Sequence, residues 1–333
     1  MAGAQRSRAP RGRAAETRRE GASDFAIAER EDSLVWILGS SRSGSTWMLR
    51  MLADLPRVVP LDDPHLGHHL GVWRPIALAW SHRDRVPDLN ILPEVKRDKP
   101  DYFFSDEYRH VWLPALRRMV AERFDVQARD RARERGIDDP LVIVKEPGSH
   151  AADLIMSMFP GAGLIFLLRD GRDVVDSWLD AYKAGSWALE EGAYSVGAQD
   201  RMAFIRWQSS VWLYRTEVVQ RAFEAHPEDR KLLVRYEEVR QDPAAALQRI
   251  CDRFGIRSSA DHVAEVADRH GFVRAPGDQT GPGKAMRFAE PGRWRLNMTP
   301  DEIEAMLEIM GPKLEELGYV PRQPAILAGP ASR

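Results

Sequence analysis

The chain has 333 residues, of which 44% are hydrophobic, enough to form a sizeable core in one large domain or two small ones. Its 48 basic and 50 acidic residues leave a net charge of -2, which argues against a general nucleic-acid or membrane-surface binder, because such proteins carry a basic excess. No apolar run approaches the length of a membrane span, and the single cysteine, Cys251, excludes an internal disulfide and fits a reducing compartment. We therefore expect a cytoplasmic protein.

The N-terminal segment, residues 1–31, is rich in arginine, alanine, glycine and serine. It cannot bury enough apolar surface to offset the entropy lost on ordering, so we predict a disordered tail. Acidic residues within it argue against a transit peptide. We predict a single domain over residues 32–320 and a C-terminal tail over residues 321–333.

A buried strand, a small-residue turn and an amphipathic helix follow one another from Leu34 to Leu52. Such a loop can bind an anion, because its amides and the helix N-terminus point N–H groups at the ligand. A nucleotide-triphosphate loop has Gly-Lys at its end, whereas here Gly44 is followed by Ser45 and the cation comes earlier, at Arg42. The pattern predicts a phosphate site without the lysine that binds a triphosphate.

The next stretch, residues 55–65, is predicted to be a loop that returns from this helix. It carries two adjacent carboxylates, Asp62 and Asp63, which are unusual near an anion site. Three histidines follow at helical spacing: His65, His68 and His69. No zinc motif accompanies them, so we expect no metal and place them at the rim of an acceptor pocket. Residues 71–136 are rich in tryptophan, proline and arginine, and we predict that they cover the acceptor site.

Further apolar strands are predicted at residues 141–144, 164–168 and 231–235, and helices at about 173–182 and 198–225. Lys145 follows the first of these strands, and Arg169 follows the second, where a nucleotide-triphosphate enzyme would have a magnesium-binding aspartate. The third strand leads into a predicted loop that begins at Tyr236. Strands that alternate with helices predict an α/β protein, a three-layer α/β/α domain with a mostly parallel central sheet.

Two of these motifs resemble the donor site of sulfotransferases that use 3′-phosphoadenosine 5′-phosphosulfate (PAPS). The 5′-phosphosulfate loop of that family is similar to the run Arg42, Ser43, Gly44, Ser45, Thr46 and Trp47. Its 3′-phosphate motif resembles Arg169 and Ser177, which are eight residues apart. The resemblance implies a P-loop-like sulfotransferase fold, PAPS as the donor, 3′,5′-adenosine bisphosphate (PAP) as the product and no metal.

The same resemblance implies further donor contacts. Tyr236 would lie beside the adenine, and Trp47 would stack on it. The family's C-terminal signature, which closes over the 3′-phosphate, resembles Gly292, Arg293 and Trp294. Counted back from the tryptophan, Arg287 takes the place of the family's phosphate-binding arginine.

The resemblance also implies catalytic residues. Lys145 corresponds to the lysine that binds the sulfuryl group, and Asp63 falls where the tyrosylprotein branch carries a catalytic glutamate. Pro147 stands where the cytosolic branch carries its catalytic histidine, so that base is missing. Asp63, Glu146 and His150 are the candidate bases.

Together these patterns predict direct in-line transfer of a sulfuryl group from PAPS to a hydroxyl or amine. The acceptor is expected to be a small molecule or a carbohydrate, and no motif names it. Two alternatives are a nucleotide-dependent kinase on a related P-loop scaffold and a catalytically inactive nucleotide-binding protein.

Overall fold

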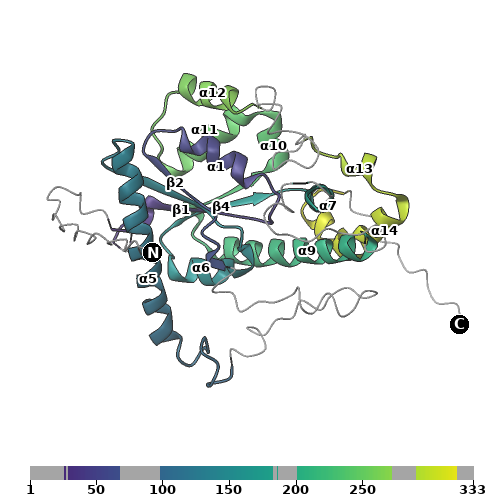
Figure 1. The fold of residues 1–333 in the computed structure, drawn as a ribbon, viewed down its shortest axis with the longest axis horizontal. Coiled ribbons are helices and arrows are strands. Elements are labelled where there is room, and N and C mark those ends of the chain that lie inside the picture. Colours follow the sequence, from purple (N-terminus) through teal and green to yellow (C-terminus); the bar gives the residue numbers. More distant parts are fainter. Residues whose placement is uncertain are drawn as a thin grey trace, which may run out of the picture.

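The computed structural model describes residues 26–67 except 28, then 98–182, 186, 201–271 and 290–320. Five parallel strands form one sheet in the order β2-β3-β1-β4-β5 (Figure 1). The strands are β1 (Leu34–Leu38), β2 (Val58–Asp62), β3 (Leu141–Lys145), β4 (Gly163–Leu168) and β5 (Lys231–Arg235). Strands β1, β3 and β4 are buried along their whole length, as expected for a parallel sheet covered on both faces. The predicted α/β fold with a parallel central sheet is confirmed.

Helices cover both faces of the sheet (Figure 1). One layer consists of α1 (Ser45–Ala53), α10 (Tyr236–Gln241), α11 (Pro243–Phe254) and α12 (Ala260–Arg269). The other contains α5 (Arg109–Glu134), α6 (Ala152–Met158), α7 (Gly171–Ala181), α9 (Arg201–Ala225), α13 (Trp294–Asn297) and α14 (Pro300–Glu316). Short 3₁₀ turns lie at Glu31–Ser33, Ser149–Ala151 and Glu228–Arg230.

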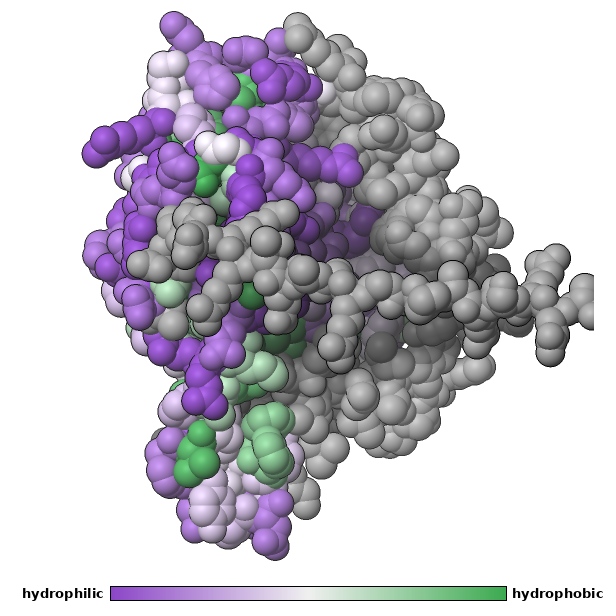
Figure 2. Space-filling view, turned by 60° about the vertical axis from the view of Figure 1, so that its left-hand side comes forward, coloured by the Kyte–Doolittle hydropathy of each residue, from purple (hydrophilic) through white to green (hydrophobic). Residues whose placement is uncertain are grey.

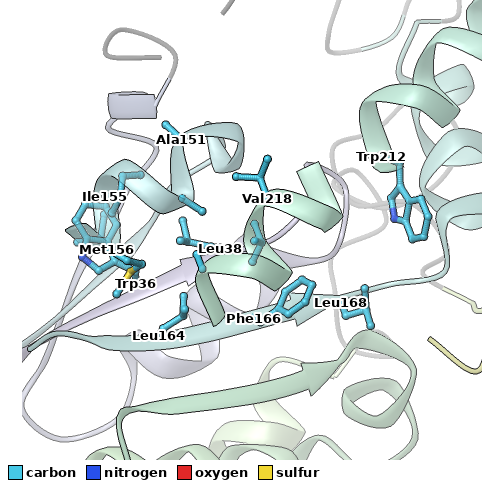
Figure 3. Close-up of a cluster of buried hydrophobic side chains, with 14 of the residues drawn as sticks. Trp36, Leu38, Ala151, Ile155, Met156, Leu164, Phe166, Leu168, Trp212 and Val218 are labelled. Carbon is cyan, nitrogen blue, oxygen red and sulfur yellow. The ribbon is translucent and has the colours of Figure 1, made fainter. Parts of the chain in front are cut away.

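The central strand β1 divides its side chains between the two cores, because successive residues of a strand point to opposite faces. Trp36 and Leu38 face α6 and α9, whereas Val35 and Ile37 face α1 and α11. The Trp36 ring packs against Phe124, with 5.8 Å between ring centroids. Figure 3 shows Trp36 beside residues of α6, and Leu38 near Val218 of α9. Packing of helices on both faces holds the sheet in place, and the loops at its carboxyl edge are attached to this framework.

Two helices begin with side-chain caps that are typical of their sequences. The Asp242 carboxylate accepts a hydrogen bond from the Ala245 amide at 2.9 Å, at the start of α11. At the start of α14, Thr299 and Glu302 form the reciprocal capping box that their spacing predicts. The predicted helix in residues 173–182 is also present, as α7, which begins two residues earlier.

Two local predictions were wrong. The stretch predicted as a returning loop contains β2, which pairs with β3 at the edge of the sheet. Pro60 interrupts the strand pattern, but an edge strand tolerates a residue without an N–H. Tyr236 begins the short helix α10 rather than a loop.

Other predictions fall on residues that the structure does not describe. These are residues 1–25 and 321–333 of the two tails, residues 71–97 of the segment predicted to cover the acceptor site, and His68 and His69. The division of the chain into one domain and two tails therefore stays a prediction. Among the described helices, none is both long and apolar enough to cross a membrane.

Candidate active site

The candidate site lies at the carboxyl edge of the sheet, where parallel strands of an open α/β protein bind their ligands. All five strands run in the same direction, so the segments that follow them meet at this edge. These segments contain the loop from Gly39 to Gly44, the pair Asp62 and Asp63, Lys145 with Glu146, Arg169, and Tyr236. The topology thus brings together most of the residues that the sequence predicts for the site.

The loop between β1 and α1 has an unusual backbone. Arg42 has φ of +70° and Gly44 has φ of +92°, both in the left-handed region. A side chain at Gly39 would place its Cβ 2.1 Å from the Leu167 carbonyl oxygen, and one at Gly44 would place it 2.6 Å from the Tyr236 ring. Each glycine is therefore required by close packing. A non-glycine residue in this region costs about 1–3 kcal/mol, and such strain is concentrated at functional sites.

Arg42 links the two motifs predicted to bind the donor. Its Nε donates a hydrogen bond to Ser177 Oγ at 3.1 Å, although the two residues are 135 positions apart. Arg169 Nη1 donates to the Arg42 carbonyl oxygen at 2.8 Å, and the Arg169 guanidinium lies 4.2 Å from the centroid of the Tyr236 ring. Two guanidinium groups, a hydroxyl and the loop amides therefore converge, which is a donor set suited to phosphate oxygens.

Trp47 is buried beside this cluster. Its ring meets Tyr236 edge to face, with 6.1 Å between centroids, and its Nε1 donates to the His270 carbonyl oxygen at 2.9 Å. The guanidinium of Arg240 lies 5.9 Å from the Trp47 ring. Trp47 and Tyr236 are thus neighbours, both largely buried, and their contacts with an adenine stay a prediction.

Lys145 is the buried cation at the other end of the loop. Its Nζ lies 2.8 Å from each of three oxygens: Thr46 Oγ1, Asp62 Oδ1 and Asp63 Oδ2. The register of β2 and β3 pairs Asp62 with Lys145 directly. Asp63 has φ of +48°, which turns the chain away from the strand. Both carboxylates are about half exposed while the ammonium is buried, so an incoming acceptor can reach the acids.

Glu146 is also buried, but its carboxylate faces backbone amides. Leu66 and Gly148 donate hydrogen bonds to its two oxygens, the first at 2.8 Å. Burial raises the pKa of Glu146 to about 7, and the amides of Gly148, Leu66 and Gly67 oppose this shift only partly. Through its hydrogen bonds with Leu66 and Gly148, the Glu146 side chain holds the segment after Asp63 against the turn after β3.

Arg215 was not predicted from the sequence as a site residue. It lies in the middle of α9, where the pattern indicates core packing, and its Nη1 donates to Ser41 Oγ in the loop at 2.7 Å. Burial lowers the pKa of Arg215 to about 10, and the negative charge of Glu146 opposes this shift. The Arg215 guanidinium stays charged at neutral pH, and its hydrogen bond to Ser41 supports the loop between β1 and α1. An arginine on an otherwise apolar helix face was the signal available in the sequence.

His150 lies in the 3₁₀ turn after β3 and is only 5% exposed. Its ring is enclosed by protein, unlike the half-exposed carboxylate of Asp63. The three candidate bases therefore differ in exposure, and Asp63 is the one open to solvent.

The C-terminal motif is held against α7, the helix that carries Ser177. The Asp173 carboxylate accepts hydrogen bonds from the amides of Gly292 at 2.7 Å and Trp294 at 3.4 Å. Burial raises the pKa of Asp173. Arg293 forms an ion pair with Glu290 at 3.8 Å. Arg287 lies outside the described residues, so its predicted phosphate contact stays a prediction.

No cluster of three or more His, Cys, Asp or Glu side chains suited to a metal ion occurs in the described ranges. Three cationic side chains of the protein could meet a phosphorylated ligand. Arg42, Lys145 and Arg169 all lie at the carboxyl edge of the sheet.

A pH dependence of stability follows from Glu146. Its pKa is raised from 4.5 to about 7 in the folded protein, so the carboxyl group favours folding fully below pH 4.5, and this contribution is lost as the pH rises through 7. We expect the free energy of unfolding of the native protein to fall by about 3 kcal/mol, relative to Glu146→Gln, between low and neutral pH. Urea unfolding of both proteins at a series of pH values measures this difference. Glu122→Gln, an exposed helical site, is the control and should follow the native protein. A constant difference between native protein and Glu146→Gln would contradict the raised pKa.

Comparison with known proteins identifies the family of the chain. The family model described as "Sulfotransferase family" matches residues 35–260, and the chain belongs to that family. No curated protein matches the sequence.

Solved structures of sulfotransferases are similar at low identity. Mouse sulfotransferase SULT7A1 complexed with PAP is 13% identical, with a TM-score of 0.47, over 90% of this chain and 93% of that one. Sulfotransferase STF9 from Mycobacterium avium is 17% identical, with a TM-score of 0.48, over 87% and 78%. The sulfotransferase domain of the Synechococcus PCC 7002 olefin synthase is 20% identical, with a TM-score of 0.44, over 83% and 93%.

Proposed function

We propose that this sulfotransferase transfers a sulfuryl group from PAPS directly to a hydroxyl or amine of a small-molecule or carbohydrate acceptor and releases PAP. The observation that carries the proposal is the contact of Arg42 with Ser177, supported by the hydrogen bond from Arg169 to the Arg42 carbonyl. It joins the loop that would bind the 5′-phosphosulfate to the motif that would bind the 3′-phosphate. A donor with phosphates at both positions fits such a paired site.

In this reaction the acceptor oxygen or nitrogen attacks sulfur, and the bond from sulfur to the bridging oxygen breaks. Negative charge then grows on the bridging oxygen of PAP, where fixed cations lower the barrier more than mobile ones in water. Arg42 and Lys145 are the cations we assign to this role. Lys145 can serve the sulfuryl group and keep a carboxylate contact, because an ammonium carries three N–H donors.

We assign the removal of the acceptor proton to Asp63. Its carboxylate lies 2.8 Å from Lys145 Nζ, and its side chain is 42% exposed. The two carboxylate oxygens of Glu146, in contrast, already accept hydrogen bonds from backbone amides. A general base must reach the proton that it removes, and this requirement favours Asp63 over Glu146 and the enclosed His150. No covalent intermediate on the protein is required.

The donor contacts in this proposal are those of the loop, of Arg169 and Ser177, and of the aromatic pair Trp47 and Tyr236. The remaining contacts would come from the C-terminal motif at Gly292, Arg293 and Trp294. We place the protein in the cytoplasm, since its one cysteine, Cys251, is a buried free thiol.

Calorimetric titration of PAP into the purified protein without magnesium tests the donor assignment, with ATP as a competitor. We expect PAP to bind at least about tenfold more tightly than ATP, because ATP lacks a 3′-phosphate and would leave Arg169 and Ser177 without their ligand. ATP binding that needs magnesium, or equal affinities, would favour the kinase alternative. Tight PAP binding without transfer to any acceptor would favour an inactive nucleotide-binding protein.

A further inference from the structure

Helix α7 carries polar side chains that are buried on one face. Most polar side chains of a protein lie at its surface, and Figure 2 shows mainly hydrophilic residues on the side of the molecule that carries α5. On α7, three carboxylates and a hydroxyl follow one another at steps of three, one and three residues, which keeps them on one face. They are at most 5% exposed: Asp173, Asp176, Ser177 and Asp180. Burial of a carboxylate is costly unless it is hydrogen-bonded, so the partners of this polar face indicate its role.

The partners of the first two carboxylates belong to the C-terminal motif and the short helix α13. The Asp173 carboxylate accepts hydrogen bonds from the amides of Gly292 and Trp294. One turn further along α7, both carboxylate oxygens of Asp176 lie 3.1 Å from Nδ2 of Asn297, which donates to them. The second contact joins side chains that are 121 positions apart, at the end of α13. The C-terminal motif is therefore attached to α7 at two successive turns.

A stacked arginine adds a third contact between the two elements. The Arg172 guanidinium lies 4.3 Å from the centroid of the Trp294 ring, and Arg172 is buried. Its Nε and Nη2 donate to the Asp170 carboxylate at 3.0 Å and 2.7 Å, which fixes the guanidinium plane. These contacts hold the backbone on both sides of Arg293. Because Asp173 and Ser177 are four residues apart, the attached motif lies within about one helical turn of the Ser177 hydroxyl.

We propose that the hydrogen bond between Asn297 and Asp176 is a positioning contact, which docks the C-terminal motif on α7 and so sets the affinity for the 3′-phosphate of the donor. The inference rests on the proposed use of PAPS. Ser177, the next residue after Asp176, accepts the hydrogen bond from Arg42 Nε. Helix α7 thus connects the loop after β1 to the C-terminal motif. Asp176 and Asn297 act through this motif and need not touch the ligand themselves.

Calorimetric titration with PAP and with adenosine 5′-phosphate (AMP) tests this role, because AMP lacks the 3′-phosphate. We expect the native protein to bind PAP more tightly than AMP. Asn297→Asp keeps the size of the side chain but replaces the donor with a second carboxylate facing Asp176. It should weaken PAP binding at least about tenfold and change AMP binding less than about threefold. Leu296→Asp adds the same charge one residue away, at a side chain that is 80% exposed, and this matched control should bind PAP like the native protein.

An exchange of the two partners separates this contact from a general effect of charge. In the double variant Asp176→Asn with Asn297→Asp, the amide at position 176 can donate to the carboxylate at position 297. PAP affinity should then return to within about threefold of the native value. Unchanged PAP affinity in Asn297→Asp, equal losses for PAP and AMP, or a double variant that binds PAP no better than Asn297→Asp would overturn the inference. A native protein that binds PAP no more tightly than AMP would refute the proposed donor, and this inference with it.

Discussion

Replacement of Arg42 by alanine is expected to lower sulfuryl transfer at least about 1,000-fold and leave the protein folded. One donor aimed at developing negative charge is worth about 100- to 1,000-fold in rate, and Arg42 also connects the loop to Ser177 through its hydrogen bond at 3.1 Å. The stability of the fold should change little, because Arg42 lies in a loop and alanine adopts its φ of +70° at no greater cost than arginine.

The measurement is the rate of acceptor-dependent PAP release from PAPS, together with the dissociation constant of PAP. We expect PAP to bind about 10- to 100-fold more weakly to Arg42→Ala, since a hydrogen bond to a charged group contributes about 1.5–3 kcal/mol. Arg257→Ala removes an exposed arginine from a loop that contributes nothing to the site, and it should match the native protein in both readouts. Nearly normal turnover in a folded Arg42→Ala protein would refute the proposed mechanism.

Much of the fold could be predicted because its central strands are buried on both faces. Such strands are continuous apolar runs. Strand β1 begins at Leu34 as predicted, and β3 and β4 lie within one residue of their predicted ranges. The helix caps at Asp242 and Thr299 were also predictable, since a cap is set by residues a few positions apart. Edge strand β2 was not, because Pro60 is typical of loops and only its place in the sheet makes it tolerable.

Some contacts of the candidate site could likewise be predicted from the sequence, and others could not. In a parallel sheet, residues that follow a strand reach a common edge, so the meeting of Arg42, Lys145 and Arg169 could be predicted from their places just after three apolar runs. The contact of Arg215 with Ser41 could not, because it joins residues 174 positions apart and depends on how α9 packs. The role of Glu146 depends likewise on the amide of Leu66, which is 80 positions away.

The two adjacent carboxylates beside Lys145 allow a matched test of the base. Asp63→Asn is expected to lower the rate of transfer by about 100- to 10,000-fold, the usual contribution of a general base. The affinity for PAP should stay within about threefold of the native value, because the Asp63 carboxylate faces Lys145 and the acceptor side rather than Arg169 and Ser177.

Asp62→Asn is the control, since both aspartates lie 2.8 Å from Lys145 Nζ and are about equally exposed. Each substitution removes one negative charge next to the same ammonium and leaves a side chain of nearly the same size. Asp62 ends a strand and pairs with Lys145 in the sheet, whereas Asp63 is the residue at which the chain turns away. If Asp63 takes the proton, Asp62→Asn should lower the rate less than about tenfold. An equal loss in both variants would mean that the aspartates act only by holding Lys145, and the base would then have to be sought elsewhere, with Glu146 next.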